Sequence, residues 1–291
     1  MFANNKPRTK GAIQDTNREP LQMKTFMRFV LPAFVAVLLV AQVTPASAEV
    51  KTRTITYSEG GVTLKGVLAW NDQATTPRPG VLVVHEWWGL DDYAISRAKQ
   101  LAAEGYVAFA ADMYGDNKLT KHAKDASGWM KQITSNVDAW RARADAGLKV
   151  LAAQKEVDGS KLAAIGYCFG GSTVMQMAYA GSPVKLVASF HGSLPPASDD
   201  VKAIKSRVYV AHGRADKFIP MDRVVAFKQR LDDTNANWRM DIFSGAVHGF
   251  TNPGADELGK LNNIPLKYDP SADRASWAAM HQMLAETFGG F

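Results

Sequence analysis

Apolar and polar residues alternate along two neighbouring stretches that follow residue 48. Residues 52–58 (TRTITYS) and 62–70 (VTLKGVLAW) show this two-residue period, and the turn-forming residues 59–61 (EGG) separate them. A two-residue period on both sides of a glycine turn predicts an antiparallel hairpin. Beyond it the pattern changes to continuous apolar runs, which are typical of strands buried on both faces of a sheet. These runs cover residues 80–86, 106–112, 161–167, 186–192, 207–213 and 240–245.

Amphipathic stretches with a helical period lie between most of these runs. Strands that alternate with helices predict βαβ units and a mostly parallel sheet. Neither an internal repeat nor a low-complexity linker interrupts the alternation, so we expect residues 49–291 to form one domain. The predicted helices cover residues 93–104, 121–155, 170–180, 220–233 and 273–288.

The first 48 residues have the features of an export signal. Lys24 and Arg28 precede an apolar run of 13 residues (29–41, FVLPAFVAVLLVA), and residues 46–48 (ASA) supply the small side chains of a cleavage site. The run is shorter than the roughly 20 residues that span a bilayer, so a transmembrane anchor is the less favoured alternative. We therefore expect residues 1–48 to be an N-terminal extension and signal peptide, and the mature chain to be exported to the periplasm.

The basic character of the sequence belongs largely to this leader. The full chain has 34 basic and 28 acidic residues, and residues 1–48 hold six and two of them. The remaining 28 basic and 26 acidic residues leave a formal charge of +2 and form no cluster that would bind nucleic acid. We expect a small-molecule substrate, no nucleic-acid partner, no membrane association after leader cleavage, and a monomer or weak homo-oligomer.

Polar residues mark the ends of the predicted strands. At the carboxyl ends of parallel strands, loops converge on one edge of the sheet and reactive groups collect there. One of these residues is the chain's single cysteine. Because cysteines of exported proteins usually pair in disulfides, an unpaired one is a buried inert residue, an intermolecular link or a functional thiol. The strand-end residues are Glu86, Asp112, Cys168, His191, Asp216 and His248.

The sequence around Cys168 favours a functional thiol over a small core residue. Residues 166–170 (GYCFG) fit the pattern glycine, any residue, nucleophile, any residue, glycine between a predicted strand and a predicted helix. At such a turn the nucleophile has strained backbone angles, and side chains two residues away on either side would collide. The following helix directs its free amides and positive dipole end at the sulfur, which favours the thiolate.

A base and an acid follow the nucleophile along the chain. Asp216 lies in the loop after the run at 207–213, and His248 lies in the loop after the next run. A thiol nucleophile needs a base such as histidine, and the base needs an orienting acid. The order nucleophile, acid, histidine is that of the α/β-hydrolase fold, so we predict this fold, with a mostly parallel sheet of about eight strands flanked by helices. The alternatives are a helix-capping acid and an ordinary loop histidine.

This chemistry also needs donors for the negative charge that develops on an attacked carbonyl oxygen. The backbone N–H of Phe169 is one such donor, and Trp87, in the loop after the run at 80–86, is expected to supply the other. No spacing of histidine, cysteine and carboxylate residues resembles a zinc site, so we expect neither a metal nor an organic cofactor.

Several short segments share the motifs of one enzyme family. The matching positions are 86–89 (EWWG), 110–115 (AADMYG), 166–171 (GYCFGG), Asp216 and 248–250 (HGF). In this combination the chain resembles the dienelactone hydrolase (carboxymethylenebutenolidase) family of the α/β-hydrolase superfamily. The likeness runs over most of residues 52–290, and the combination is specific.

The resemblance implies a catalytic set of Cys168, His248 and Asp216 that opens a cyclic enol ester. It also implies that Glu86 holds the thiol proton in the resting enzyme and that substrate binding moves the sulfur toward His248. This role agrees with an independent consideration, since a permanent thiolate in the periplasm would oxidise and a neutral thiol is less reactive. The alternative for Glu86 is an ordinary salt-bridged or surface residue.

One position departs from the family. Members that cleave dienelactone bind the substrate carboxylate with arginines, one of them four positions after the catalytic histidine, and this chain has Asn252 there. We therefore do not expect dienelactone itself to be the substrate. An apolar substrate pocket is expected instead, with core packing as the alternative for each of its aromatic residues. These residues are Trp87, Trp88, Tyr114, Trp129 and Phe250.

Together these observations predict an exported hydrolase that cleaves a small ester or lactone through a cysteine nucleophile. A thioesterase or carboxylesterase that acts on larger acyl groups is the alternative within the same class. Outside that class, the alternative is a catalytically degenerate periplasmic protein that binds aromatic acids without turnover. A redox-sensing thiol protein is a further alternative, but the sequence has no second cysteine to resolve an oxidised Cys168.

Overall fold

The alternating residues that follow the leader form a hairpin, as their pattern predicts. The computed structural model describes residues 49–290, and within them β1 (Val50–Glu59) pairs antiparallel with β2 (Val62–Asn71). Gly60 and Gly61 form the turn with φ values of 58° and 75°, in the left-handed region that glycine adopts without steric cost. The predicted signal peptide and its cleavage site lie outside the described residues.

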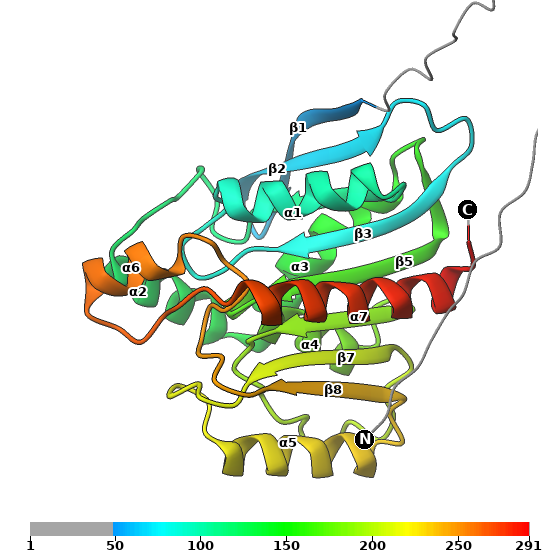
Figure 1. The fold of residues 1–291 in the computed structure, drawn as a ribbon. Helices are drawn as coiled ribbons and strands as arrows, with labels where there is room; N and C mark the ends of the chain where they lie inside the picture. Colours follow the sequence, from blue (N-terminus) through cyan, green and yellow to red (C-terminus); the bar gives the residue numbers. More distant parts are fainter. Residues whose placement is uncertain (1–48, 291) are drawn as a thin grey trace, which may run out of the picture. The chain divides into compact units, whose positions relative to one another are not determined.

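The continuous apolar runs complete an eight-stranded sheet with the order β1-β2-β4-β3-β5-β6-β7-β8. Figure 1 shows this sheet from β1 and β2 at the top to β8 at the bottom. β2 joins β4 in antiparallel orientation, and every later pair in this order is parallel. The structure therefore confirms the predicted, mostly parallel sheet of about eight strands. The remaining strands are β3 (Arg78–Val84), β4 (Val107–Ala111), β5 (Val157–Tyr167), β6 (Leu186–Phe190), β7 (Arg207–Gly213) and β8 (Trp238–Phe243).

Helices connect most of the parallel strands, and most of these helices agree with the predicted ranges. The stretch 121–155 is an exception, because it forms two helices, α2 (Ala123–Thr134) and α3 (Val137–Ala152), where one is predicted. The break occurs at Asn136, whose side chain accepts the N–H of Ala139 and so caps the start of α3. The other helices are α1 (Asp92–Ala103), α4 (Phe169–Ala180), α5 (Met221–Asp233), α6 (Ala255–Asn262) and α7 (Pro270–Phe288).

The sheet separates two hydrophobic cores, because successive side chains of a strand point to opposite faces. In β3, Leu82 and Val84 belong to the core that α3, α4 and α5 cover, whereas Val81 and Val83 belong to the core under α1 and α7. All four side chains are fully buried. Burial on both faces explains why the strand sequences are continuously apolar and do not alternate.

Four loops meet at the carboxyl edge of the sheet, because β3, β5, β7 and β8 run in the same direction. β3 ends at Val84, so Glu86 lies in the loop beyond the strand and not inside it. β5 ends immediately before Cys168. The loops after β7 and β8 carry Asp216 and His248. The parallel sheet therefore brings residues that are distant in sequence to one edge.

Candidate active site

Cys168 lies at a sharp turn between β5 and α4. Its backbone angles are φ 53° and ψ −112°, which a residue with a side chain adopts only where the surrounding structure enforces them. The two flanking glycines explain how the turn fits. A Cβ at Gly166 would lie 2.1 Å from the carbonyl oxygen of Gly170, and one at Gly170 would lie 2.1 Å from that of Val84. The structure therefore has the strained turn that the sequence predicts around the thiol.

The backbone N–H of Cys168 has two acceptors. Its N–H donates to the carbonyl of Phe190 at 2.9 Å and to Nδ1 of His191 at 3.1 Å. Cys168 is half-buried and is the N-cap residue of α4, whose first residue is Phe169. The first N–H groups of a helix have no intrahelical partner, so the Phe169 amide is able to bind an oxygen next to the sulfur.

His248 and Asp216 form a buried pair. Nδ1 of His248 and Oδ2 of Asp216 are 2.8 Å apart. The other carboxylate oxygen of Asp216 accepts the N–H groups of Phe218 and Ile219 at 2.8 and 3.3 Å, so the loop before α5 fixes the acid. Because Nδ1 is bound to the acid, Nε2 is the ring nitrogen left for a thiol and its substrate.

The side chain of Cys168 affects the pKa of the same imidazole. Burial alone would lower the pKa of His248, but the adjacent Cys168 and Asp216 side chains raise it well above its usual value. A raised pKa favours the imidazolium form of His248. The structure thus brings together the three residues that the sequence singles out as nucleophile, base and acid.

Glu86 is the buried carboxyl of the site. It is 3% exposed and accepts a hydrogen bond from the Asn252 amide at 2.5 Å. Burial, together with the charge of Asp91, raises the pKa of Glu86 to about 7. Asn252, His248 and Arg97 act in the opposite direction. The resemblance predicts a resting state in which Glu86 holds the thiol proton; in this structure the carboxyl binds Asn252, and the sulfur acts on His248.

The aromatic residues predicted to form a pocket lie in different environments. The hydroxyl of Tyr114 donates to the carbonyl of Trp87 at 3.1 Å, and this bond holds the loop that carries the predicted second oxyanion donor. Trp88 lines a pocket of about 750 Å³ together with Asn252. Phe250 is fully buried among other core rings, so in this structure it belongs to the core and not to a pocket wall.

A buried network, which no motif in the sequence indicates, holds the loop after β8. Arg97 of α1 donates to the carbonyl of Thr251 at 2.7 Å and forms an ion pair with Asp273 of α7. The hydroxyl of Thr251 lies 2.6 Å from that of Tyr93 and 2.7 Å from Nε2 of His191. The one available sequence signal is that Arg97 occupies the apolar face of a predicted helix, where a charge needs a buried partner.

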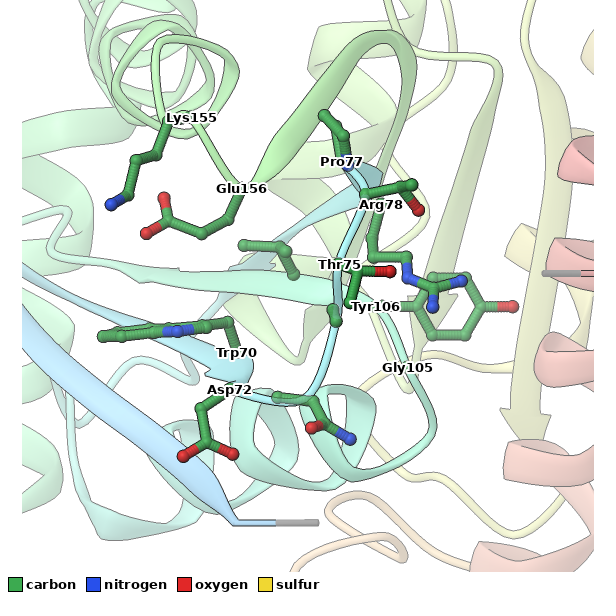
Figure 2. A pocket seen from close by; sticks show the side chains of 13 residues that line it. Trp70, Asp72, Thr75, Pro77, Arg78, Gly105, Tyr106, Lys155 and Glu156 are labelled. Carbon is green, nitrogen blue, oxygen red and sulfur yellow. The ribbon is translucent and has the colours of Figure 1, made fainter.

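A second pocket lies at the opposite edge of the sheet, where the parallel strands begin (Figure 2). Its volume is about 280 Å³, and residues that precede β3, β4 and β5 border it. We call it the amino-end pocket. The side chains labelled in Figure 2 are Trp70, Asp72, Thr75, Pro77, Arg78, Gly105, Tyr106, Lys155 and Glu156.

Metal-binding clusters and membrane-spanning helices are both absent from the described part of the chain. Within residues 49–290, no group of three or more histidine, cysteine or carboxylate side chains could hold a metal ion. Across that same span, every helix is too short or too polar to cross a membrane.

The sequence of residues 64–288 matches the dienelactone hydrolase family. Among curated proteins, a putative carboxymethylenebutenolidase of Aquifex aeolicus (strain VF5) is 27% identical over 233 residues, which cover 77% of this chain and 93% of that protein. Protein usf of Aquifex pyrophilus is 27% identical over 234 residues, again 77% of this chain and 93% of that protein.

Solved structures give the same result. A dienelactone-hydrolase-like promiscuous phosphotriesterase from metagenomic libraries is 38% identical, with a TM-score of 0.79 over 82% of this chain and 99% of that one. An acylaminoacyl peptidase is 13% identical, with a TM-score of 0.64 over 83% of this chain and 42% of that one, and it shows the fold alone. The predicted α/β-hydrolase fold is confirmed, and the chain belongs to the dienelactone hydrolase family.

Proposed function

We propose that the protein hydrolyses small, uncharged carboxylic esters or lactones with Cys168 as the nucleophile. The observation that carries this proposal is the buried His248–Asp216 pair beside a thiol on a strained turn. Membership of a hydrolase family supports the reaction class. A sulfur with an adjacent base, and a base with an adjacent acid, are the groups that covalent acyl transfer requires.

Acylation begins when the sulfur attacks the carbonyl carbon of the ester. The C–S bond forms, the carbonyl π electrons move to oxygen, and the backbone N–H groups of Phe169 and Trp87 donate to the resulting oxyanion. When the carbonyl re-forms, the C–O bond to the leaving alcohol breaks, and the imidazolium of His248 protonates that oxygen. In a lactone the alcohol stays attached to the acyl group, so the ring opens on the enzyme.

Water completes the cycle. The neutral imidazole of His248 takes a proton from water, the oxygen attacks the thioester carbon, and sulfur departs as the thiolate. Asp216 holds the imidazole through Nδ1 and stabilises its charged form in both half-reactions. The thiolate of Cys168 and the imidazolium of His248 are then restored, and the acid product leaves.

Glu86 is proposed to accept the S–H hydrogen bond of Cys168 in the resting enzyme, so that the proton stays on the sulfur and the thiol is neutral. With a pKa of about 7, its carboxyl exchanges a proton near neutral pH. The charge of His248 also acts on Glu86, so the state of one affects the other. In this proposal, the arrangement with Cys168 acting on His248 corresponds to the reactive state, and the arrangement with a neutral thiol protects the sulfur from oxidation between turnovers.

The surroundings of Glu86 favour an uncharged substrate. Asp91 and Asn252 both line the pocket of about 750 Å³, and Asn252 brings a neutral amide to the Glu86 carboxyl. A substrate carboxylate in this pocket would lie near the acidic side chain of Asp91, and position 252 supplies an amide in place of a cation. The lysine that lines the pocket, Lys121, forms an ion pair with Glu257. The apolar wall that Trp88 and Leu258 form suits a neutral acyl or alkyl group.

The experiment compares the wild-type protein with Cys168→Ala. Turnover is measured on p-nitrophenyl acetate and on paired unsaturated lactones that differ only in a carboxylate, and mass spectrometry follows an acyl adduct on Cys168. We expect turnover and adduct in the wild type alone, with the neutral lactone cleaved faster. Equal rates for both proteins would contradict the proposal. Faster cleavage of long-chain thioesters would favour the thioesterase alternative, and tight binding without turnover would favour the binding protein.

A second candidate reaction is the cleavage of phosphotriesters. The observation that favours it is the 38% identical relative, which is described as a promiscuous phosphotriesterase. Here the sulfur would attack phosphorus, the aryl oxide would leave, and the same backbone amides would donate to the phosphoryl oxygen. Diethyl p-nitrophenyl phosphate tests this reaction. Repeated release of p-nitrophenolate that requires Cys168 supports it, whereas a single release with a stable adduct shows inhibition only.

We also propose that the mature chain is exported and begins at Glu49. The support is the order of basic, apolar and small residues within residues 1–48. Intact mass measurement of protein recovered from the periplasmic fraction tests the proposal. A mass that corresponds to residues 49–291 is expected, and a mass that includes Met1 or Met23 would contradict it.

A further inference from the structure

His85, the residue before Glu86, is a fully buried polar side chain that the reaction described above does not use. Both of its ring nitrogens have partners. Nε2 accepts the N–H of Met113 at 3.2 Å, and Nδ1 lies 2.5 Å from the carbonyl oxygen of Glu86. A backbone N–H only donates and a carbonyl only accepts, so the ring is neutral and carries its proton on Nδ1. Burial lowers the pKa of His85, which agrees with a neutral ring.

This tautomer fixes the peptide unit between Glu86 and Trp87. The carbonyl of Glu86 accepts the Nδ1–H of His85 and, at 3.4 Å, the N–H of Gly89. In a trans peptide the C=O and the N–H point in opposite directions within one plane. Two donors on the carbonyl therefore also fix the direction of the Trp87 N–H, which points away from the His85 ring.

The same loop packs on the start of α4. A Cβ at Gly170 would lie 2.7 Å from the carbonyl oxygen of His85, so the two backbones are in direct contact. The His85 ring also lies 6.0 Å from the ring of Phe169. The segment that carries the Trp87 N–H is thus placed against the helix turn that carries the Phe169 N–H. These are the two amides that acyl transfer needs on one side of the sulfur.

We propose that His85 is a positioning residue that aims the Trp87 N–H at the oxyanion formed during acyl transfer. The inference rests on the proposed function, because it assigns His85 to the transition state of that reaction. An oxyanion donor typically contributes about 10²- to 10³-fold to kcat, and a donor that is present but no longer fixed in direction loses part of this contribution.

The test compares ester turnover with another reaction of the same sulfur. Iodoacetamide alkylates Cys168 at a saturated carbon and releases iodide, so this reaction needs the thiolate but forms no oxyanion. For His85→Ala, we expect kcat on p-nitrophenyl acetate to fall about 10- to 100-fold. We expect KM and the rate of alkylation to stay close to their wild-type values, because the Cys168–His248 pair is untouched.

Two further variants separate the hydrogen bonds of the ring. The amide of an asparagine reaches the position of Nδ1, so His85→Asn retains a donor for the Glu86 carbonyl. The amide of a glutamine reaches the position of Nε2, so His85→Gln retains only a partner for Met113. We expect kcat to recover in His85→Asn and to stay low in His85→Gln, with similar thermal unfolding temperatures. This pair also carries the test if His85→Ala does not fold.

Different results overturn different statements. Wild-type kcat in His85→Gln would show that the Nδ1 hydrogen bond has no part in catalysis. A parallel loss of turnover and alkylation in a folded variant would show that His85 acts on the Cys168–His248 pair and not on the oxyanion. If the wild-type protein shows neither ester turnover nor an acyl adduct, the proposed function itself is contradicted. The role of His85 is then contradicted as well, before any variant is compared.

Discussion

The two edges of the sheet both carry aromatic and ionisable residues, but they arrange them differently. At the carboxyl edge, Glu86, Asp216 and His248 are buried and hydrogen-bonded. At the amino edge, Asp72 and Lys155 are exposed around the smaller amino-end pocket (Figure 2). Burial shifts pKa values and strengthens the interaction between charges, whereas water screens exposed charges. Ionisable residues around a pocket therefore form a reactive site only where burial shifts their pKa values and strengthens the interactions between them.

The direction of the chain explains which edge is reactive. In the parallel part of the sheet, helices begin near the carboxyl ends of strands, and Cys168 stands at the start of α4. Near the amino ends, helices finish, as α3 does at Ala152 before Lys155. A helix N-terminus stabilises a negative charge such as a thiolate or an oxyanion, and a C-terminus does not.

Removal of the base gives the largest expected difference between the edges. His248→Ala should lower kcat/KM on p-nitrophenyl acetate by at least about 10³-fold, because the thiol and the attacking water then lack a proton acceptor. Steady-state kinetics measure the effect, and thermal unfolding verifies that the variant is folded. A loss below about tenfold would show that His248 is not the base.

A side chain added at the turn that carries Cys168 gives the next largest expected effect, which is a loss of stability. Gly170→Ala should destabilise the fold by at least about 3 kcal/mol, because its Cβ would lie 2.1 Å from the carbonyl oxygen of Val84. Gly128→Ala is the matched control, since Gly128 is exposed within α2 and no atom lies within 4 Å of the position that its methyl group would take. There the gain in helix propensity should stabilise by about 0.5–1 kcal/mol. Urea unfolding measures both, and equal values would contradict the prediction.

The titration of Glu86 makes the stability of the folded protein depend on pH. Between an ordinary glutamate pKa of 4.5 and the value of about 7 here, the folded protein holds a proton that the unfolded chain has released. Stability therefore falls as pH rises through this range, and the full penalty is present above about pH 7. Glu86→Gln lacks this penalty, so its stability relative to wild type should increase by about 3 kcal/mol between pH 4.5 and pH 8. Urea unfolding at both pH values measures this, and a constant difference would show that the carboxyl titrates normally.

Changes at the amino-end pocket give the smallest expected effect. Lys155→Ala and Trp70→Ala remove a charge and a wall of this pocket, yet each should leave kcat and KM within about twofold of wild type. The same kinetic assay serves as the measurement. A tenfold change in kcat or KM of either variant would mean that the two edges are coupled. It would contradict the statement that only the carboxyl edge takes part in the reaction.

The nucleophile turn, the order of the catalytic residues and the parallel strands could be predicted from the sequence, because each depends on local structure. Gly166 and Gly170 mark the turn around Cys168 because a Cβ at either position would collide with backbone atoms. The chain order of Cys168, Asp216 and His248 then indicates the fold, since strand-end loops meet at one edge. The continuous apolar runs predict the parallel strands for the same physical reason, which is burial on both faces.

Contacts between segments that are distant in the chain leave no recognisable pattern in the sequence. The departure at Asn252 is visible in the sequence, but its partner, Glu86, is 166 positions away and is identified only by the fold. The break between α2 and α3 is also hard to predict from periodicity, because both helices continue a helical pattern and only the two capping residues, Ser135 and Asn136, separate them. The short helix α6 is missed because it has only eight residues, about two turns of pattern.

The ion pair between Arg97 and Asp273 has a consequence for the order of events during biosynthesis. A nascent chain that ends before α7 already contains Cys168, Asp216 and His248, but it lacks the carboxylate that pairs with Arg97 under the loop after β8. Until α7 docks, the buried guanidinium of Arg97 lacks this carboxylate, and its charge under the loop is not compensated. The loop that carries His248 therefore gains its full support only when α7 joins the fold.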